Sequence, residues 1–386
     1  MFKRWLSLPE KKSCLVIGPR RSGKTTLLKQ RYPMLPYATL DDLDLLDWAK
    51  KDPKGFIQYF GSPAIIDEIQ RHPPLTIAVK YAIDNADARL LMTGSSTIGL
   101  MDAAADTLAG RINIVPLPAA CWGENYGDPL HSIFHDQAGP LQLKEGGRGL
   151  NEALHYGQFP EVLNQQSIDA KKQILANYKN TYFTRDLMQL SNIENLDGLM
   201  AVFHHLIRSI GSHLEVSGFA KESGLSHPTA KKYLNALSQA QLTFKLYGYQ
   251  YGPAKRFIKA AKTYFADNGI IKSFNVRLNE GQLVENFVIS ELEKRRKLGL
   301  IRTDQFYYYK STGGNEIDLI FEIDEIVFAI EIKATARPGP KDLRNLKQFK
   351  DRLDRPVKRF LFYSGETYRK EDDIRLIPIS AFFRGS

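Results

Sequence analysis

The stretch GPRRSGKTTL, residues 18–27, has the residue types and the spacing of a phosphate-binding loop. It fits G-x-x-x-x-G-K-[ST] between an apolar run and a helical pattern, which is the context that this motif requires. Glycines let backbone N–H groups approach phosphates, the lysine reaches the β and γ oxygens, and the threonine hydroxyl coordinates Mg²⁺. The stretch therefore predicts a site for ATP and Mg²⁺ built by Gly18, Pro19, Arg20, Arg21, Ser22, Gly23, Lys24, Thr25 and Thr26.

Polar residues that end two further apolar runs extend this nucleotide chemistry. In AIIDE, Asp67 ends a strand-like run, where it can hold the magnesium through water, and Glu68 can polarise the attacking water. In LLMTGSS, Thr93 and Ser95 end the next run and could sense the γ-phosphate, although hydroxyls in a turn are an equal alternative. The loop alone would fit a kinase or a GTPase equally well, and the acidic pair favours an ATPase.

Phosphoryl transfer often uses an arginine that stabilises charge on the γ-phosphate. Arg111 in LAGRI is our candidate for this arginine finger, and Arg185 in YFTRDL is the second choice. The commoner role of an arginine is a surface ion pair, and that alternative stays open for both.

Acidic and basic residues alternate on two apolar runs near the C-terminus. The period of two in VFAIEIKAT places Glu331 and Lys333 on one face of a strand, and the same rule places Asp318 of NEIDLIFE on one face of another. If the two strands pair, Asp318 can lie beside Glu331, with Glu285 of LVENFVI nearby. Three carboxylates as metal ligands and Lys333 as a catalytic residue could bind a divalent cation and orient a water for phosphodiester attack. The alternative is a hairpin with a solvated charged face.

Basic residues are concentrated in one segment of a chain whose formal net charge is +10. Residues 216–262 hold eight Lys or Arg and one Glu, a net +7. The same segment has the layout of a helix-turn-helix, with Gly224 at the turn and Pro228 in the first turn of the second helix. Local basic density of this kind suits a polyanion, although a solvated face is the alternative. We expect DNA as a partner, contacted by Lys231, Lys232, Lys255, Arg256 and Lys259.

The elements that must position these residues form an α/β pattern in more than one domain. A chain of 386 residues is too long for one ordinary core. Apolar runs within residues 13–17, 63–70, 88–96 and 111–120 are typical of parallel strands, and 165–212 is helical in pattern. The two cysteines lie far apart, and no apolar run approaches the roughly 20 residues of a membrane span, so we expect a cytoplasmic protein without a membrane partner.

Taken in order, the motifs quoted above, together with YFADNGI and GQLVENFVISEL, resemble the bacterial and archaeal AAA-type ATPases that carry a C-terminal domain of unknown function. The resemblance implies an AAA-like P-loop core over residues 1–164, a helical lid or linker over 165–212 and a winged helix-turn-helix over 213–262. It implies a restriction-endonuclease-like α/β domain, the PD-(D/E)XK nuclease fold, over residues 263–386. By motif, Asp67 and Glu68 take the Walker B roles, Asp318, Glu331 and Lys333 the nuclease positions, and Glu285 the helix carboxylate. The stretch GGNEID lacks the proline of the nuclease signature.

These observations lead to two functional hypotheses. The first is an ATPase that couples nucleotide turnover to binding or remodelling of DNA, with a metal-dependent nuclease-like domain. The second is a nucleotide-dependent switch that binds proteins and keeps the nuclease-like domain as an inactive scaffold. A homo-oligomer fits both hypotheses, because a neighbouring copy often supplies the arginine in AAA-type ATPases.

Overall fold

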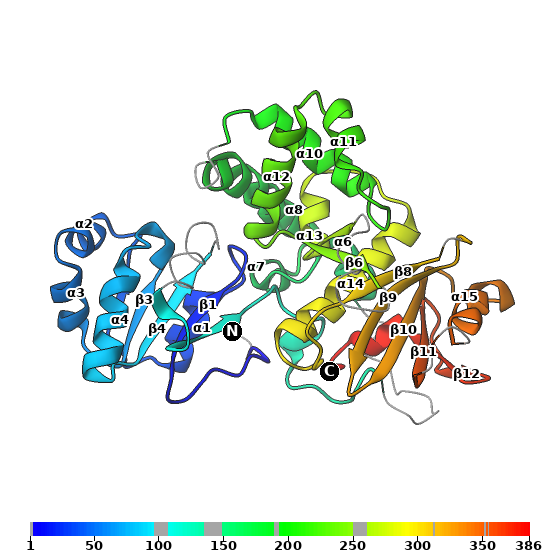
Figure 1. Ribbon diagram of the computed structural model, residues 1–386, viewed down its shortest axis with the longest axis horizontal. Helices are drawn as coiled ribbons and strands as arrows, with labels where there is room; N and C mark the ends of the chain where they lie inside the picture. Colours follow the sequence, from blue (N-terminus) through cyan, green and yellow to red (C-terminus); the bar gives the residue numbers. More distant parts are fainter. Residues whose placement is uncertain are drawn as a thin grey trace.

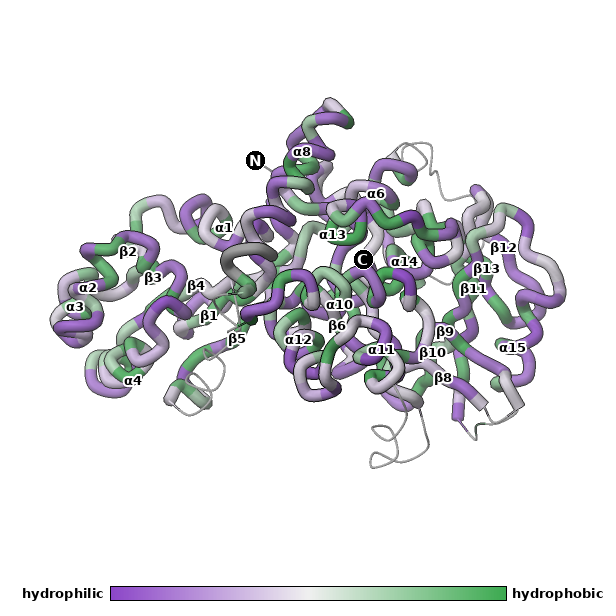
Figure 2. The backbone as a smooth tube through the Cα atoms, turned by 90° about the horizontal axis from the view of Figure 1, so that it is seen from above, coloured by the Kyte–Doolittle hydropathy of each residue, from purple (hydrophilic) through white to green (hydrophobic). Residues whose placement is uncertain are grey.

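Two sheets form the frame of the molecule. The computed structural model describes residues 3–95, 107–134, 149–188, 193–249, 261–311, 313–350, 353 and 355–386, with the side chains of 183–186 and 350 left aside. Figures 1 and 2 place the first sheet and its helices at one end of the long axis, the second sheet at the other, and a group of helices between them. Among the described residues, no helix combines the length and the apolar character that crossing a membrane requires.

The first sheet has five parallel strands in the order β2-β3-β4-β1-β5. The three central strands β3, β4 and β1 are short apolar runs that are buried along their length. In β1, Leu15 packs in one hydrophobic cluster and Val16 in another. The predicted parallel strands are therefore confirmed. The elements of this part are β1 (Ser13–Ile17), α1 (Lys24–Arg31), β2 (Tyr37–Thr39), α2 (Leu43–Lys51), α3 (Pro53–Phe60), β3 (Ala64–Asp67), η1 (Ile69–Arg71), α4 (Leu75–Ala86), β4 (Leu90–Gly94), β5 (Ile112–Pro116) and η2 (Glu124–Tyr126).

Helices dominate the middle of the chain. Asn195 and Ser226 cap α10 and α12 by accepting hydrogen bonds from backbone N–H groups of the first turn. Gly224, at φ 64°, breaks the chain between α11 and α12, which lie where the sequence predicts a helix pair. The winged-helix assignment stays a prediction. The elements are α6 (Leu150–Tyr156), α7 (Pro160–Leu163), α8 (Ile168–Tyr178), η3 (Lys179–Leu187, a π-helix), α10 (Leu196–Arg208), α11 (Val216–Glu222), α12 (His227–Gln239) and α13 (Asn268–Ser273).

The second sheet has eight strands of mixed direction in the order β12-β13-β11-β10-β9-β8-β6-β7. The hairpin of β6 and β7 joins it because β6 pairs with β8, Tyr247 lying opposite Tyr307. The expected domain boundaries, one of which falls at residue 262, stay a prediction. The elements are β6 (Thr243–Gly248), β7 (Lys262–Phe265), α14 (Glu280–Lys297), β8 (Tyr307–Lys310), β9 (Glu316–Ile323), β10 (Ile326–Lys333), α15 (Pro340–Lys350), β11 (Val357–Tyr363), β12 (Arg369–Glu371), β13 (Ile374–Pro378) and η5 (Ile379–Phe382).

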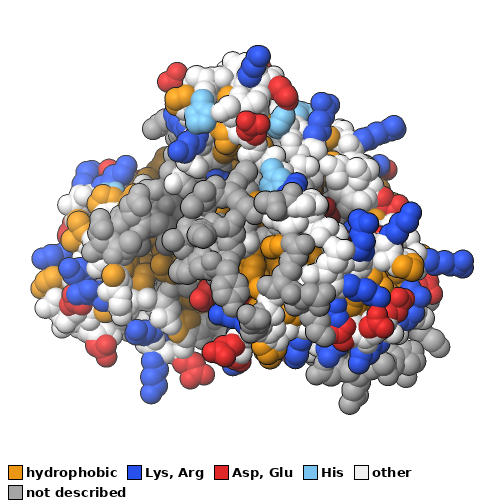
Figure 3. Space-filling view, turned by 45° about the vertical axis from the view of Figure 1, so that its right-hand side comes forward, with side chains coloured by type: hydrophobic (Ala, Val, Ile, Leu, Met, Phe, Trp, Pro, Cys, Tyr) orange, Lys and Arg blue, Asp and Glu red, His pale blue; other side chains and the backbone are white. Residues whose placement is uncertain are grey.

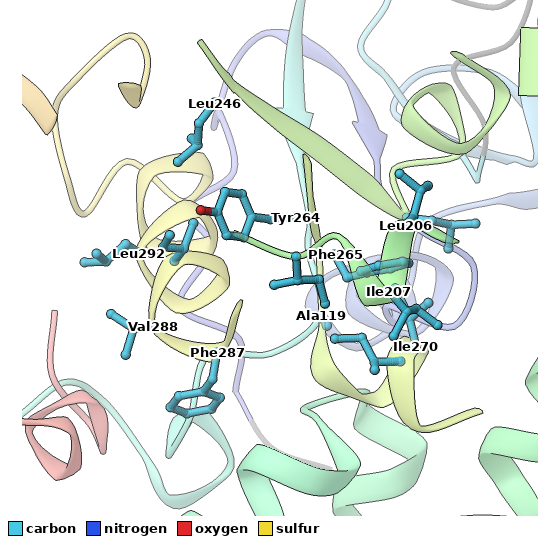
Figure 4. Close-up of a cluster of buried hydrophobic side chains, with 14 of the residues drawn as sticks. Ala119, Leu206, Ile207, Leu246, Tyr264, Phe265, Ile270, Phe287, Val288 and Leu292 are labelled. Atoms are coloured by element: carbon cyan, nitrogen blue, oxygen red, sulfur yellow. The ribbon is translucent and has the colours of Figure 1, made fainter. Parts of the chain in front are cut away.

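Helix α14 lies in the centre of the largest hydrophobic cluster. Figure 4 shows Phe287, Val288 and Leu292 of this helix in the same cluster as Tyr264 of β7. The cluster also includes Trp122, whose ring centroid lies 5.8 Å from that of Phe287. One buried core therefore connects the segment after the first sheet with the second sheet.

Candidate functional site

Two glycines shape the loop between β1 and α1. Gly23 has φ 92°, a left-handed conformation that costs glycine little. At Gly18, a Cβ atom would lie 2.0 Å from the carbonyl oxygen of Leu117, so no side chain fits there. Within the described part of the chain, the buried hydroxyl of Ser22 has no hydrogen-bond partner. The loop thus offers close backbone approach and one unused buried polar group, as a phosphate-binding cradle requires.

Lys24 is buried at the start of α1. Its Nζ donates to the carbonyl oxygens of Gly18, at 3.0 Å, and Pro19, at 3.1 Å. Burial lowers the pKa of Lys24 to about 8, while the nearby charges of Glu68 and Asp67 oppose that shift. Hydrogen bonds therefore hold the ammonium of Lys24 against the loop that would bind the phosphates.

Asp67, the last residue of β3, accepts hydrogen bonds from three hydroxyl groups. Thr25 Oγ1 lies 2.7 Å and Thr93 Oγ1 2.5 Å from its Oδ1 atom, and Tyr37 OH lies 2.8 Å from its Oδ2 atom. The strand order brings them together, because β3 lies between β2 and β4. Burial, and then the contact with Asp67, raises the pKa of Tyr37. The sequence reading missed Tyr37, because a three-residue strand leaves almost no pattern.

Glu68 follows β3 in a left-handed conformation, at φ 57°. Its N–H donates to Thr93 Oγ1 at 3.1 Å, and its Oε2 atom accepts from Ser95 Oγ at 2.9 Å and from the amide of Gln70. Thr93 and Ser95 therefore contact Asp67 and Glu68, and their predicted role as sensors of the γ-phosphate stays a prediction. Gln70 is a second residue that the sequence reading missed.

These residues fit ATP and Mg²⁺. A buried ammonium and a glycine-lined loop suit phosphate oxygens, and a hydroxyl beside a carboxylate suits a hard divalent cation. Of the other predicted loop contacts, Thr26 lies in the first turn of α1, and Arg21 forms an ion pair of 3.1 Å with Glu161 of α7. Their roles on the nucleotide, and that of Arg20, stay predictions.

Arg111 lies at the opposite end of the sheet from the loop. It precedes β5, and β5 runs parallel to β1 with Ile112 beside Ser13, whereas the loop follows Ile17. A strand of five residues, about 16 Å, separates the two ends. Its guanidinium pairs with both carboxylate oxygens of Asp84, at 2.6 and 3.0 Å. Arg111 therefore lies out of reach of phosphates in its own chain, and a role in a neighbouring copy stays a prediction. The side chain of Arg185 lies outside the described residues.

The C-terminal carboxylates come together as the alternation predicts. Strands β9 and β10 pair in antiparallel fashion as far as Ile330 opposite Leu319, so Asp318 and Glu331 are the next residue on each strand. This confirms the predicted strand pairing. Asp318 Oδ2 accepts from the N–H of Ile332 at 2.8 Å, and Glu331 Oε1 lies 2.6 Å from Lys333 Nζ.

Glu285 of α14 completes this acidic cluster, which we define as Glu285, Asp318 and Glu331. Its Oε1 atom accepts from the hydroxyl of Tyr264 at 2.7 Å. Burial, and then the charge of Asp318, raises the pKa of Glu285 to about 7 and raises that of Glu331 well above its usual range. Glu331 Oε2 is buried and has no hydrogen-bond partner among the residues that the structure describes.

No three acidic, histidine or cysteine side chains of the described chain have the arrangement that holds a metal ion. The carboxylates of the acidic cluster nevertheless influence one another. Glu331 is buried, and Glu285 and Asp318 are half-buried. Glu285, Asp318 and Glu331 as metal ligands, and Lys333 as a catalytic residue, stay predictions.

Two of the five predicted DNA contacts can be placed. Lys231 and Lys232 are exposed on α12, whereas Lys255, Arg256 and Lys259 lie outside the described residues. On the face that Figure 3 shows, Lys and Arg side chains are spread among acidic ones over several elements. The structure therefore describes only some of the basic residues that give residues 216–262 their net charge of +7.

Comparisons with known proteins agree with the nucleotide site. Residues 10–125 match a family described as an AAA domain, residues 147–280 match a domain of unknown function, DUF8612, and residues 280–382 match another, DUF4143. An uncharacterized protein of Mycobacterium tuberculosis is 25% identical over 339 residues, covering 84% of this chain and 71% of that relative. An uncharacterized protein of Methanocaldococcus jannaschii is 25% identical over 407 residues, covering 96% of this chain and 87% of that relative.

Among solved structures, protein VC1899 from Vibrio cholerae aligns over 96% of this chain and 95% of its own, at 13% identity and a TM-score of 0.21. A score that low supports no statement on the fold. The predicted AAA-type core is confirmed by the match of residues 10–125, and a C-terminal domain of unknown function is confirmed by the match of residues 280–382. Residues 10–125 are thus similar to an AAA domain, and residues 280–382 to the DUF4143 domain.

Proposed function

We propose that this chain binds and hydrolyses ATP at the carboxyl ends of β1, β3 and β4. The observation that carries the proposal is the convergence of Lys24, Thr25, Asp67 and Glu68, which hydrogen bonds hold at that edge of the sheet. An AAA domain over residues 10–125 supports the same chemistry at the level of the family.

Each residue has a role that follows from its contacts. Lys24 would exchange the carbonyl oxygens of Gly18 and Pro19 for phosphate oxygens, which carry more negative charge. Thr25 and Asp67 would hold Mg²⁺, which neutralises charge on the phosphates when it is bound. Glu68 would accept a proton from the attacking water, with Ser95 and Gln70 fixing the direction of its carboxylate.

We further propose that ATP turnover is coupled to DNA binding through a winged helix that includes α11 and α12. The support is the exposure of Lys231 and Lys232 on α12 and the net charge of +7 over residues 216–262. Neutralising phosphates with lysines releases counterions, so this binding should weaken steeply with salt.

The test combines ATP hydrolysis with DNA binding at low salt. Glu68→Gln should lower kcat by about 10²- to 10⁴-fold while nucleotide binding persists, because a lost general base costs that much. The double variant Lys231→Glu, Lys232→Glu should weaken DNA binding and abolish any stimulation of hydrolysis by DNA. Lys50→Glu with Lys51→Glu is the matched control, since these are also adjacent exposed lysines on a helix. Hydrolysis indifferent to every form of DNA, without binding at low salt, would refute the coupling.

A nucleotide-dependent protein-interaction switch is the second candidate. The observation that favours it is the arrangement of the acidic cluster, which does not form a metal site as it stands. Cleavage of DNA in Mg²⁺ or Mn²⁺ that is lost in Asp318→Ala and in Lys333→Ala would establish a nuclease. Cleavage that persists in both variants would place the active site elsewhere, and its complete absence in the unaltered chain would favour the scaffold.

A further inference from the structure

Tyr37 contacts the nucleotide site from an element that the phosphate-loop chemistry does not use. Its hydroxyl lies 2.8 Å from Asp67 Oδ2, whereas Thr25 and Thr93 share the other carboxylate oxygen, Oδ1. Tyr37 is therefore the one described side chain bonded to Oδ2 through a hydrogen bond.

The ring of Tyr37 is itself anchored. Lys29 Nζ lies 3.6 Å from its centroid, and the ring packs against the hydrophobic cluster on one face of the first sheet. Lys29 lies one turn after Thr25 on α1, so the two side chains project from the same side of the helix. Contacts thus run from Thr25 of α1 to Asp67 at the end of β3, from Asp67 to Tyr37 of β2, and from Tyr37 back to Lys29 of α1.

We propose that Tyr37 is a positioning residue that holds Asp67 for the magnesium ion of a bound nucleotide. The inference rests on the proposed ATPase function. If the hydroxyl of Thr25 turns towards the cation, Asp67 loses one donor on Oδ1, and the bond from Tyr37 to Oδ2 keeps the carboxylate in place. Partners that orient a metal ligand in this way typically change metal affinity by about 10- to 100-fold when they are removed.

The variant Tyr37→Phe removes only the hydroxyl. The ring, its packing and its contact with Lys29 remain, so the fold of the strand should persist. Tyr32→Phe is a matched control: Tyr32 packs against the same cluster, lies under the guanidinium of Arg89, and bonds through its hydroxyl to Arg89 at 3.1 Å. Its hydroxyl therefore bonds to Arg89 rather than to Asp67, and the residue caps the far end of α1.

The experiment measures binding of a fluorescent ATP analogue to the full chain, first in EDTA and then across a titration of Mg²⁺. In Tyr37→Phe we expect unchanged affinity in EDTA and a Mg²⁺ midpoint about 10-fold higher than in the unaltered chain. Tyr32→Phe should match the unaltered chain in both conditions.

The outcomes separate this inference from the proposed function. An unchanged or lower Mg²⁺ midpoint in Tyr37→Phe would overturn the role of Tyr37 while leaving ATP binding intact. An equal rise in Tyr32→Phe would also overturn it, because the effect would then come from general loosening of the sheet. An unaltered chain that binds no nucleotide in either condition would instead refute the proposed function.

Discussion

Two glutamates on the same helix, the half-buried Glu285 and the buried Glu291 of α14, have opposite surroundings. Glu291 accepts hydrogen bonds from the N–H of Trp122 at 2.9 Å, from Lys294 at 2.9 Å and from Arg295 at 2.6 Å. Burial favours its neutral form, but these cations outweigh burial and lower the pKa of Glu291. At Glu285, less than two turns earlier, burial and then the charge of Asp318 raise the pKa to about 7.

The difference shows that the charged and hydrogen-bonding neighbours of an acid decide whether its pKa follows burial or is lowered against it. We call Glu291, Lys294 and Arg295 the joint, because their contacts connect α14 to other segments. Lys294 also donates to the carbonyl oxygen of Ala120 at 3.2 Å, and Arg295 donates to that of Phe382 at 2.7 Å. Around Glu285, the negative charge is only partly compensated, and one buried oxygen of Glu331 has no hydrogen-bond partner in the described chain. Perturbed groups of the second kind are typical of functional sites.

The largest expected effect breaks the joint. Glu291→Gln removes the negative charge between Lys294 and Arg295, and the cations stay buried. Breaking a buried ion pair from one side costs about 3–5 kcal/mol in the free energy of unfolding. Chemical denaturation measures this loss. Glu280→Gln, an exposed position in the first turn of α14, is the control and should change stability by less than about 0.5 kcal/mol. If Glu291→Gln lowered the free energy of unfolding by less than about 1 kcal/mol, the ion pairs of Glu291 would not be what stabilises the joint.

The sequence predicted the parts of the fold that have local patterns. The strands β1, β3 and β4 are short apolar runs, of which β3 and β4 lead into polar residues. The alternation in β9 and β10 placed Asp318 beside Glu331. Both patterns depend on residues within one strand, where periodicity is readable.

The sequence did not predict what depends on distant pairing. Glu291 and Trp122 lie 169 positions apart, and nothing near either residue indicates the other. Tyr37 lies on a strand of three residues, and its role appears only once β2 pairs with β3. Arg111 is the candidate arginine finger by sequence, but the direction of β5 places it at the end of the sheet away from the phosphate-binding loop.

The two ends of α14 should also respond to pH in opposite directions. Between pH 4.5, the ordinary pKa of Glu285, and about 7, its pKa in the folded chain, the folded state binds more protons than the unfolded state. The contribution of Glu285 is thus present below pH 4.5 and is lost as pH rises through about 7, by up to about 3 kcal/mol. The contribution of Glu291 has the other sign: it is present above pH 4.5 and is lost as pH falls through its lowered pKa.

The measurement is the free energy of unfolding from pH 4.5 to 8 in the unaltered chain and in Glu285→Gln. The difference between the two curves should grow with pH over this window, with the variant gaining relative stability. Parallel curves would mean that Glu285 is compensated as Glu291 is, and the contrast between the two ends would fail.

The smallest expected effect tests whether the acidic cluster is held under mutual repulsion. Asp318→Asn removes one charge and retains an oxygen that can accept from the N–H of Ile332. At pH 8 the variant loses attraction to Lys333 and Lys262 but relieves repulsion on Glu331 and Glu285. Because burial already disfavours the charged form of Asp318, the balance should be a gain of about 1 kcal/mol, read from the unfolding midpoint.

Whether Asp318→Asn gains or loses stability distinguishes a binding site from a purely structural cluster. A titration with Mn²⁺ makes that distinction clearer. If the cluster binds a cation, Mn²⁺ without nucleotide should raise the unfolding midpoint of the unaltered chain, and Asp318→Asn should lose this rise, since a ligand that binds only the folded state stabilises it. A loss of stability in Asp318→Asn at pH 8, with no response of either chain to Mn²⁺, would give Asp318 the structural role that Glu291 has at the other end of the helix. The acidic cluster would then be a second joint, and the switch would be preferred over the nuclease.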